Sequence, residues 1–387
     1  MERRPISFYD FIGLGLGKTT YQEFVDKMMA DTQNGLRTPG FAWSPYMQLD
    51  FAYDQIEAEL AIYTMATYVD IDSPAPYKSS EEVELSSGKI PRFKHGYALN
   101  EKILRDHAIL SKKMGGMMSP NLREDMLTLL FNHSEKLIVG NYNTLTYQRD
   151  QMISNGGFML TTENNPGGIQ KIEFKANIPS ANKKALTGDK RWFIDDNGTE
   201  GSKSNPIADL KDMVTLATRK GVLRRHFEVG KSTFDKTLSH SAVRLAIGWA
   251  KSPIAGEEAA KQIGANITDD EAKTILERLI GAPIEVNENI VSVESFDKKT
   301  RKIVKPQIIS FKENTWVLVP DGALGEIKVV EPIWVDDPAA RVATYDGGRM
   351  VLKQTYDLRT NTQYIESECT ALVVPDKPKY MFYLTIM

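Results

Sequence analysis

Hydrophobic side chains recur at helical spacing over one long stretch of the chain, from Asn121 to Ser154. Apolar residues that repeat every three or four positions lie on one face of a helix, and no proline interrupts this run, so the pattern predicts a single long α-helix. Gly140 is a weak point that can mark a bend, and Asn155-Gly156-Gly157 ends the helix. A helix this long exceeds the globular average and is expected to cross a whole domain. The apolar positions are Leu122, Met126, Leu129, Leu130, Leu137, Ile138 and Leu145.

Helix and strand signals are also clear between residues 205 and 250. Asn205 is a suitable helix cap, because Pro206 follows it where a first turn tolerates a missing N–H, and Gly221 ends that helix. The expected order is helix, glycine, short buried strand and helix, and none of these elements offers a nucleophile, an acid–base pair or a metal ligand. The content of this region is therefore architectural. The expected elements are a helix from Pro206 to Arg219, a strand around Phe227 and Val229, and a helix beginning at Ser232 or Thr233.

Beyond this region the pattern changes from helical to β-type. It predicts a helix over Asp269–Ile280, capped by Thr268 or Asp269 and ended by Gly281. A β-rich tail follows it, and the final apolar run is typical of a buried strand at the end of the chain. The expected strands of the tail lie at residues 282–286, 316–320 and 380–386, and strand-like segments are also expected earlier, at 168–178.

The N-terminal part of the chain predicts extended segments rather than a compact domain. Residues 1–50 are irregular and predict an extended arm, and the alternation from Ile56 to Ile62 favours a strand, although a short helix also fits. Residues 67–98 predict a two-stranded ribbon with prolines near its ends and a polar, acidic tip at 78–88, and the ribbon has too few apolar residues to form a core of its own. A ribbon that cannot bury itself must project into solvent or lie on another surface. The alternative is a flexible surface hairpin.

Composition places the chain among ordinary soluble globular proteins of two or three compact units. It has 387 residues, of which 41% are hydrophobic and 26% charged. The formal net charge of -3 argues against a dedicated nucleic-acid binder, although a container whose wall tolerates DNA remains compatible with it. One cysteine, Cys369, excludes an intrachain disulfide and fits a reducing cytoplasm. No signal peptide or membrane span is expected.

Candidate chemistry is weak throughout, so we assign no catalytic, cofactor-binding or metal-binding residue. Gly13–Thr19 suggests a phosphate loop, but Ile12 stands where such a loop requires glycine. The histidines show no paired metal-ligand spacing and are expected to be surface or partly buried polar residues. Basic clusters at 219–225 and 298–302 lack interleaved aromatic residues and predict a solvated face or a subunit interface. The five histidines are His95, His107, His133, His226 and His240.

The order of elements resembles a known family. The order of elements over Pro206–Leu238 is Pro-x-x-Asp-Leu, a helix, a glycine, a strand and then x-x-x-Phe-x-x-Leu. This order is similar to the axial domain of tailed-phage major capsid proteins, in particular the lambda-type major capsid protein E family. The likeness extends from about Ile56 to Met387. Its other motifs are Gly281–Val286, similar to Gly-x-Pro-Ile-x-Val; Pro320–Gly325, similar to Pro-x-Gly-x-Leu-Gly; Trp334–Arg341, similar to Trp-x-x-Asp-Pro-Pro; and Pro375–Pro378.

The resemblance implies an α+β fold of the Hong Kong ninety-seven type. The charged segments 291–310 and 345–362 look longer than in a minimal member and are interpreted as insertions. The expected parts are an N-terminal arm (1–55), an extended β-ribbon loop (56–105), a peripheral domain (106–204) with a spine helix (121–155), an axial domain (205–330), and a C-terminal β segment that returns to the peripheral domain (331–387).

The resemblance also implies a non-enzymatic function. The protein is expected to self-assemble as hexamers and pentamers into the icosahedral shell of a tailed-phage head, made in the bacterial cytoplasm and enclosing double-stranded DNA without sequence-specific binding. Fewer than about 70 residues precede the extended loop, so the expected partners include a separate scaffolding protein. A portal is expected as well, with decoration or head–tail connector proteins as further partners, no membrane and no cofactor. The alternatives are a cellular encapsulin-like nanocompartment shell and a soluble enzyme whose site is dispersed in sequence.

Overall fold

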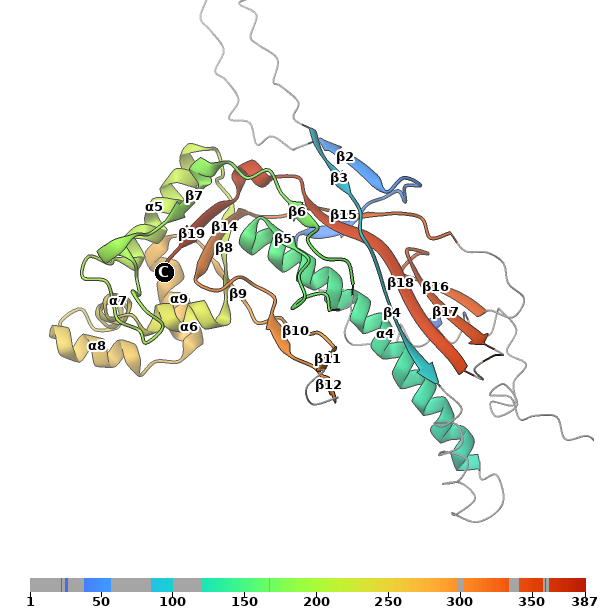
Figure 1. Ribbon diagram of the computed structural model, residues 1–387. Coiled ribbons are helices and arrows are strands. Elements are labelled where there is room, and N and C mark those ends of the chain that lie inside the picture. The colour runs from blue at the N-terminus through green and yellow to red at the C-terminus, as the bar shows by residue number, and fades with distance from the viewer. Residues whose placement is uncertain are drawn as a thin grey trace, which may run out of the picture.

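The protein has a mixed fold of helices and sheets, as the sequence predicts. Figure 1 shows a group of helices at one end of the molecule and a long helix lying along a twisted sheet at the other. Each end has its own buried hydrophobic cluster. The computed structural model describes residues 22, 25–26, 38–56, 85–99, 120–166, 168–297, 302–333, 341–357, 359 and 362–387.

The predicted long helix is confirmed as α4 (Pro120–Asn155), and it runs without interruption through Gly140. Gly140 therefore does not end the helix. A Cβ atom at this position would lie 2.3 Å from Cε1 of His95, so the glycine instead lets a neighbouring strand approach the helix closely. Nε2 of the same histidine lies 2.7 Å from the carbonyl oxygen of Leu137. The side chains of residues 122–130 are outside the part of the chain described.

A six-stranded sheet packs against α4. Its strands are antiparallel except for the first pair, in which β1 runs parallel to β15. Leu137, Ile138 and Leu145 of α4 are fully buried in the cluster between helix and sheet. The strands are β1 (Phe41–Trp43), β4 (Arg92–Leu99), β15 (Gly325–Val329), β16 (Arg341–Tyr345), β17 (Met350–Asp357) and β18 (Thr362–Pro375).

A five-stranded sheet, in the order β7-β19-β14-β8-β9, carries the helical end of the molecule. Two tryptophans and two phenylalanines pack at its centre (Trp192, Trp316, Phe227 and Phe234). The elements are β7 (Lys183–Ala185), β8 (Arg225–Gly230), β9 (Ile284–Asn287), β14 (Thr315–Pro320), β19 (Phe382–Thr385), α5 (Pro206–Arg219), α6 (Lys231–Ser239), α7 (Ser241–Lys251), α8 (Glu257–Ala265) and α9 (Asp269–Ile280), with short 3-10 turns at Ser180–Asn182, Gly188–Lys190 and Pro378–Tyr380.

The predicted caps of α5 and α9 are confirmed by their hydrogen bonds, whereas α6 begins at Lys231, just before the predicted Ser232 or Thr233. The Asn205 side chain accepts a bond from the N–H of Ala208 at 3.2 Å, and Thr268 caps α9 by accepting from the N–H of Glu271. Gly281 ends α9 with φ +78°, a left-handed conformation that glycine adopts without strain. Helices α7 and α8 are not among the elements predicted from the sequence.

Three further pairs of strands lie outside the two large sheets. The ribbon predicted over residues 67–98 is described only in part. Its β3 (Leu85–Lys89) pairs with β2 (Ala52–Ile56), which lies before the predicted range, and residues 92–98 belong to β4 of the six-stranded sheet, so the predicted second strand is wrong there. The segment interpreted as an insertion at 291–310 contains two antiparallel pairs, β10 with β13 and β11 with β12. The remaining bounds are β5 (Gly157–Met159), β6 (Glu173–Lys175), β10 (Ile290–Ser292), β11 (Ser295–Asp297), β12 (Lys302–Val304) and β13 (Gln307–Ile309).

The C-terminal segment departs from the sequence prediction. Residues 331–387 were expected to return together to the peripheral domain, but only β16, β17 and β18 lie in the sheet beside α4. The last strand, β19, pairs with β14 in the other sheet, because Phe382, Leu384 and Ile386 are buried with the aromatic cluster there. Residues 345–362, interpreted as an insertion, contain β17, an integral strand of the six-stranded sheet.

Candidate assembly surfaces

The base of the β2–β3 ribbon is anchored on the hydrophobic core. Tyr53 and Ile90 are buried against Met152 of α4 and Phe158 of β5. A Cβ atom at Gly88 would lie 2.9 Å from the Tyr53 ring, so the two strands meet closely. This packing fixes the direction in which the ribbon leaves the molecule. The segment between β2 and β3, residues 57–84, lies outside the residues that the structure describes, as do most of the arm, Gly13–Thr19 and residues 334–340.

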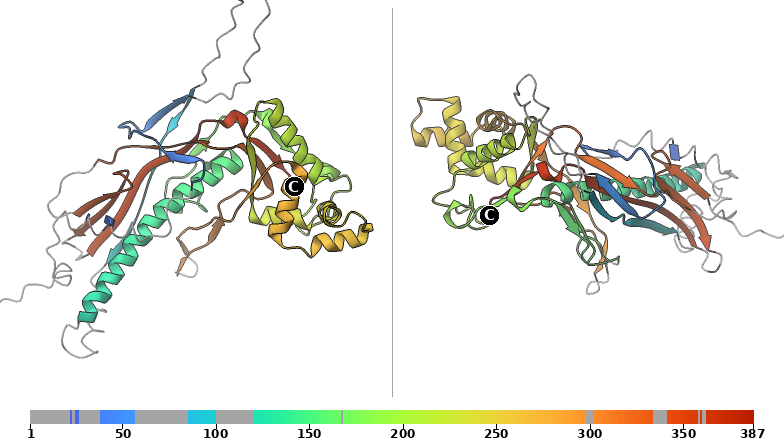
Figure 2. Two further views of the ribbon diagram at one scale, coloured as in Figure 1. Left: turned by 180° about the vertical axis from the view of Figure 1, so that it is seen from behind. Right: turned by 90° about the horizontal axis from the view of Figure 1, so that it is seen from above.

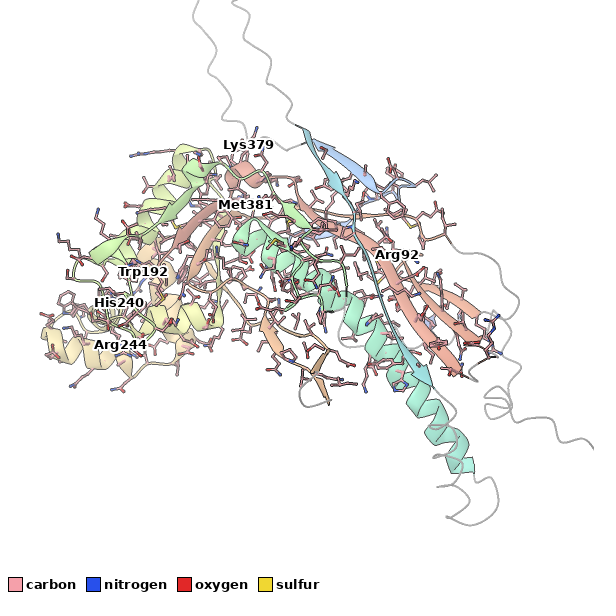
Figure 3. The ribbon with its side chains drawn as sticks, viewed as in Figure 1. Arg92, Trp192, His240, Arg244, Lys379 and Met381 are labelled. Carbon is pink, nitrogen blue, oxygen red and sulfur yellow. The ribbon has the colours of Figure 1, made fainter. Side chains whose placement is uncertain are left out.

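The ribbon continues directly into the six-stranded sheet. β3 is followed by β4, which pairs with β18 along its whole length. Glu368 of β18 binds Arg92 of β4 and lies 2.5 Å from Nζ of Lys353 on β17, so one carboxylate joins three strands. Figure 3 labels Arg92, which lies on β4. The base of the ribbon is therefore connected directly to the six-stranded sheet.

Large apolar side chains are exposed on the segment of residues 44–51, beside the ribbon base. Tyr46 is 82% exposed and Leu49 71%, with Phe51 also more than half exposed. The backbone of this segment is held in place, because Gln48 forms a parallel bridge with Val330. Contiguous exposed apolar side chains on a fixed backbone are typical of a surface that another protein covers.

A buried ion pair joins α4 to the five-stranded sheet. Arg149 of α4 donates to both carboxylate oxygens of Glu228 on β8, at 2.5 and 2.6 Å, and both side chains are 3% exposed. Nε of Arg149 also donates to the carbonyl of Pro39, which precedes β1. Burial would raise the pKa of Glu228, but the charge and hydrogen bonds of Arg149 hold that pKa below its ordinary value. The junction thus ties together the two ends of the molecule and the start of β1.

Asp150, the next residue of α4, is buried in a second part of this junction. Its carboxylate accepts hydrogen bonds from Asn287 at 2.8 Å, Asn289 at 2.9 Å and the hydroxyl of Ser310. These partners lie at the base of the 290–309 hairpin. Sequence reasoning missed the junction, and its one signal was Glu228, which stands between Phe227 and Val229 in a strand expected to be buried.

His226 forms the exposed rim of the junction. Its Nδ1 lies 2.7 Å from a carboxylate oxygen of Asp321, and its Nε2 lies 3.6 Å from Glu228 and 3.7 Å from Glu285. Burial alone would lower the pKa of His226, but its bonds to Glu228 and Asp321 raise that pKa to about 8.

The ligand atoms of His226, Glu228 and Glu285 lie within 4.8 Å of one another, the spacing of a metal site. Arg149 already binds both oxygens of Glu228, so the group is an ionic network rather than a vacant ligand set.

His240, expected to be a surface or partly buried residue, is fully buried and accepts from the N–H of Ala242 at the start of α7. Figure 3 shows it in the helical unit. Among the helices described, none has the length and apolar character of a membrane span.

We expect His226 to make the stability of the unassembled subunit depend on pH. Its folded pKa of about 8 exceeds the usual value near 6.5, so a protonated His226 stabilises the fold fully below about pH 6.5 and loses this contribution as the pH rises through about 8. Relative to His226→Gln, the wild type should lose about 2 kcal/mol of unfolding free energy between about pH 6 and about pH 9.5. Urea unfolding at a series of pH values measures this. Parallel pH profiles of the two proteins would contradict the assignment.

Solved structures of phage proteins resemble this chain at low sequence identity. A prophage protein of Escherichia coli CFT073, described as a capsid protein, has a TM-score of 0.46 and 12% identity, over 79% of this chain and 80% of that one. A phage-related protein of Bordetella bronchiseptica RB50 has a TM-score of 0.45 and 8% identity, over 94% and 95%. The capsid of Ralstonia phage GP4 has a TM-score of 0.43 and 10% identity, over 92% of each chain. These likenesses are too distant to carry an argument.

No curated protein sequence matches the chain. The family assignment rests on a family model, Phage major capsid protein E, which matches residues 28–386. The match spans nearly the whole chain and includes both sheets, α4 and the exposed segment 44–51. The chain therefore belongs to the phage major capsid protein E family, and its role is structural: it associates with copies of itself to form the shell of a phage head.

Proposed function

We propose that the protein assembles as hexamers and pentamers into an icosahedral shell around double-stranded DNA. The exposed segment 44–51 beside the anchored ribbon carries this proposal, because its large apolar side chains are not covered by the residues that the structure describes. The Hong Kong ninety-seven fold and its five named parts belong to the same proposal. Family membership does not favour the two alternatives, a cellular nanocompartment shell and a soluble enzyme.

The proposed partners follow from the same assignment. A separate scaffolding protein and a portal would guide closure of the shell, and decoration or head–tail connector proteins would bind it from outside. The net charge of -3 supports enclosure of DNA without sequence-specific binding, since tight binding to DNA requires many basic contacts to phosphates. Synthesis in the cytoplasm of a bacterial host completes the proposal.

Electron microscopy of the purified chain tests assembly directly. Shells, tubes or capsomers are expected, and their abundance should rise with protein concentration. A monomer that stays monodisperse across protein and salt concentrations, with no particles in the images, would refute the proposal.

Shortening the ribbon should separate assembly from folding. Replacing residues 57–84 by an Asn-Gly turn joins Ile56 to Leu85, which face each other in the β2–β3 ladder, so the register of the ribbon base is kept. Residues 78–84 of the replaced segment are polar and acidic, and contacts that the segment makes between subunits would be repeated at every position of the shell. Circular dichroism and melting of the subunit should change little, and closed particles should disappear. Normal shells from the shortened chain would show that the ribbon is only a surface hairpin.

A further inference from the structure

His240 is a buried histidine that connects the 195–204 loop to the start of α7. Its Nε2 lies 2.9 Å from Oγ of Ser204 and 3.8 Å from a carboxylate oxygen of Glu200. Its Nδ1 lies 3.1 Å from the backbone nitrogen of Ala242. Serine, histidine and a carboxylate are the residue types of a hydrolytic triad, so the position of the ring proton decides what this group can do.

The hydrogen bonds around the ring fix the position of that proton. The N–H of Ala242 can only donate, so Nδ1 carries no proton and the neutral ring has its hydrogen on Nε2. The hydroxyl of Ser204 donates to the carbonyl oxygen of Gly201 at 2.7 Å, and its oxygen therefore accepts from Nε2. A histidine that donates to a serine cannot remove the serine proton, so the group is not a hydrolytic site. It is instead a connection that requires a neutral imidazole.

Two side chains from outside α7 hold its first turn. The N–H of Ser241 donates to Glu200 at 2.7 Å, and the N–H of Ala242 donates to His240. The first N–H groups of a helix have no partner within the helix, so these bonds stabilise the start of α7. Protonation would remove the bond to His240, because an Nδ1–H would then face the N–H of Ala242.

The surroundings of the ring favour its neutral form. Burial lowers the pKa of His240, and the charge of Glu200 acts in the opposite direction. Among the described residues, Glu200 is the one charged group that shifts this pKa. Phe193 makes a T-shaped contact with the ring, with 5.6 Å between the centroids. Thr237 of α6 and Arg244 of α7 bond to the backbone of His240. A proton on the ring is therefore disfavoured while these contacts hold.

α7 and α8 are packed together as one unit beyond this connection. A Cβ atom at Gly248 would lie 1.9 Å from the carbonyl oxygen of Ala260, so the two helix backbones are in direct contact. Figures 1 and 2 show the pair at the outer end of the helical unit, away from α4. Ile254, in the turn between the two helices, is 97% exposed. His240 is the single residue between α6 and α7.

We propose that His240 is a proton-operated latch, which holds the α7–α8 pair against the 195–204 loop when neutral and releases the pair when protonated. Protonation removes the acceptor for the N–H of Ala242, and the pair then turns about residue 240. The exposed tip at Ile254 moves with it. The latch acts within one chain, so it goes beyond the proposed function and does not depend on assembly of a shell.

Acid is expected to open the latch. A released imidazole has the ordinary pKa near 6.5, and the latched imidazole has a lower one. The latch is therefore fully held above about pH 6.5, and its opening constant rises by up to about tenfold per pH unit below that, until the pH reaches the pKa of the latched ring. His226 has the opposite dependence, because its folded pKa is raised to about 8.

Hydrogen–deuterium exchange of the full chain at about pH 7.5 and about pH 5.5, corrected for the pH dependence of the chemical exchange rate, tests the latch. Residues 241–265 should open about tenfold more often at the lower pH, whereas residues 137–150 of α4 should keep their protection. His240→Asn should remove this difference, because asparagine caps a helix without titrating in this range. His133→Asn, which replaces a partly exposed histidine on α4, is the matched control and should behave as the wild type.

Equal acid dependence in the wild type and His240→Asn, or no acid dependence in the wild type, would overturn the proposal. A loss of protection that includes α4 would also overturn it, since general acid unfolding would then account for the change. NMR of isotope-labelled imidazole nitrogens supplies a readout that needs no folded variant at position 240. The neutral ring of His240 should carry its proton on Nε2, and a proton on Nδ1 would contradict the latch.

Discussion

Replacing Arg149 by methionine is expected to destabilise the unassembled subunit by about 3–5 kcal/mol, the cost of leaving a buried charge without its partner. Glu228 is 3% exposed and takes two hydrogen bonds from this guanidinium, so the variant leaves its carboxylate inside the protein with only His226 near it. The carboxylate should then bind a proton in the folded state. Its pKa would rise above the unfolded value, and the variant should regain stability as the pH falls.

Denaturant unfolding of a small series of variants measures this effect. The double variant Arg149→Met/Glu228→Gln should recover much of the loss, because neither side chain then carries a buried charge. Lys251→Met breaks an ion pair of 2.7 Å with Glu271 whose partners are 44% and 45% exposed, and it should cost at most about 1 kcal/mol. Equal losses in Arg149→Met and Lys251→Met would show that the junction is not buried in solution.

Leu145→Asp is expected to leave little or no folded subunit. Leu145 is fully buried between α4 and the six-stranded sheet, so the change removes a core side chain, which costs about 2–5 kcal/mol. It also introduces a carboxylate with no partner, which costs several kcal/mol more or forces the group to take up a proton. The sum is comparable with the whole stability of a typical domain, about 5–15 kcal/mol.

Asn143→Asp is the matched control, since it introduces the same side chain on the exposed face of the same helix. It should shift the unfolding free energy by no more than about 0.5 kcal/mol. Soluble yield and thermal melting by circular dichroism compare the two variants. Similar yields and melting curves would mean that the buried face of α4 is assigned to the wrong residues.

Parts of the candidate surfaces were predictable because they depend on local composition. The polar, acidic tip of the ribbon at 78–88 and the basic cluster at 298–302 are read directly from residue order. The buried junction was not predictable, because Arg149 and Glu228 are separated by 79 positions and nothing in either neighbourhood names the partner. The exposure of Tyr46 and Leu49 was equally hidden, since an apolar side chain in sequence is more often buried than not.

The sequence by itself determined those elements whose stabilising bonds are local. The caps at Asn205 and Thr268 and the stop at Gly281 involve residues a few positions apart, so residue type alone specifies them. Tertiary structure decided what depends on distant partners. Gly140 reads locally as a weak point and becomes a close contact only because β4 lies against α4. The place of β19 was also decided by tertiary structure: it pairs with β14 instead of joining the sheet that contains β18, because its apolar side chains are buried in the aromatic core of the five-stranded sheet.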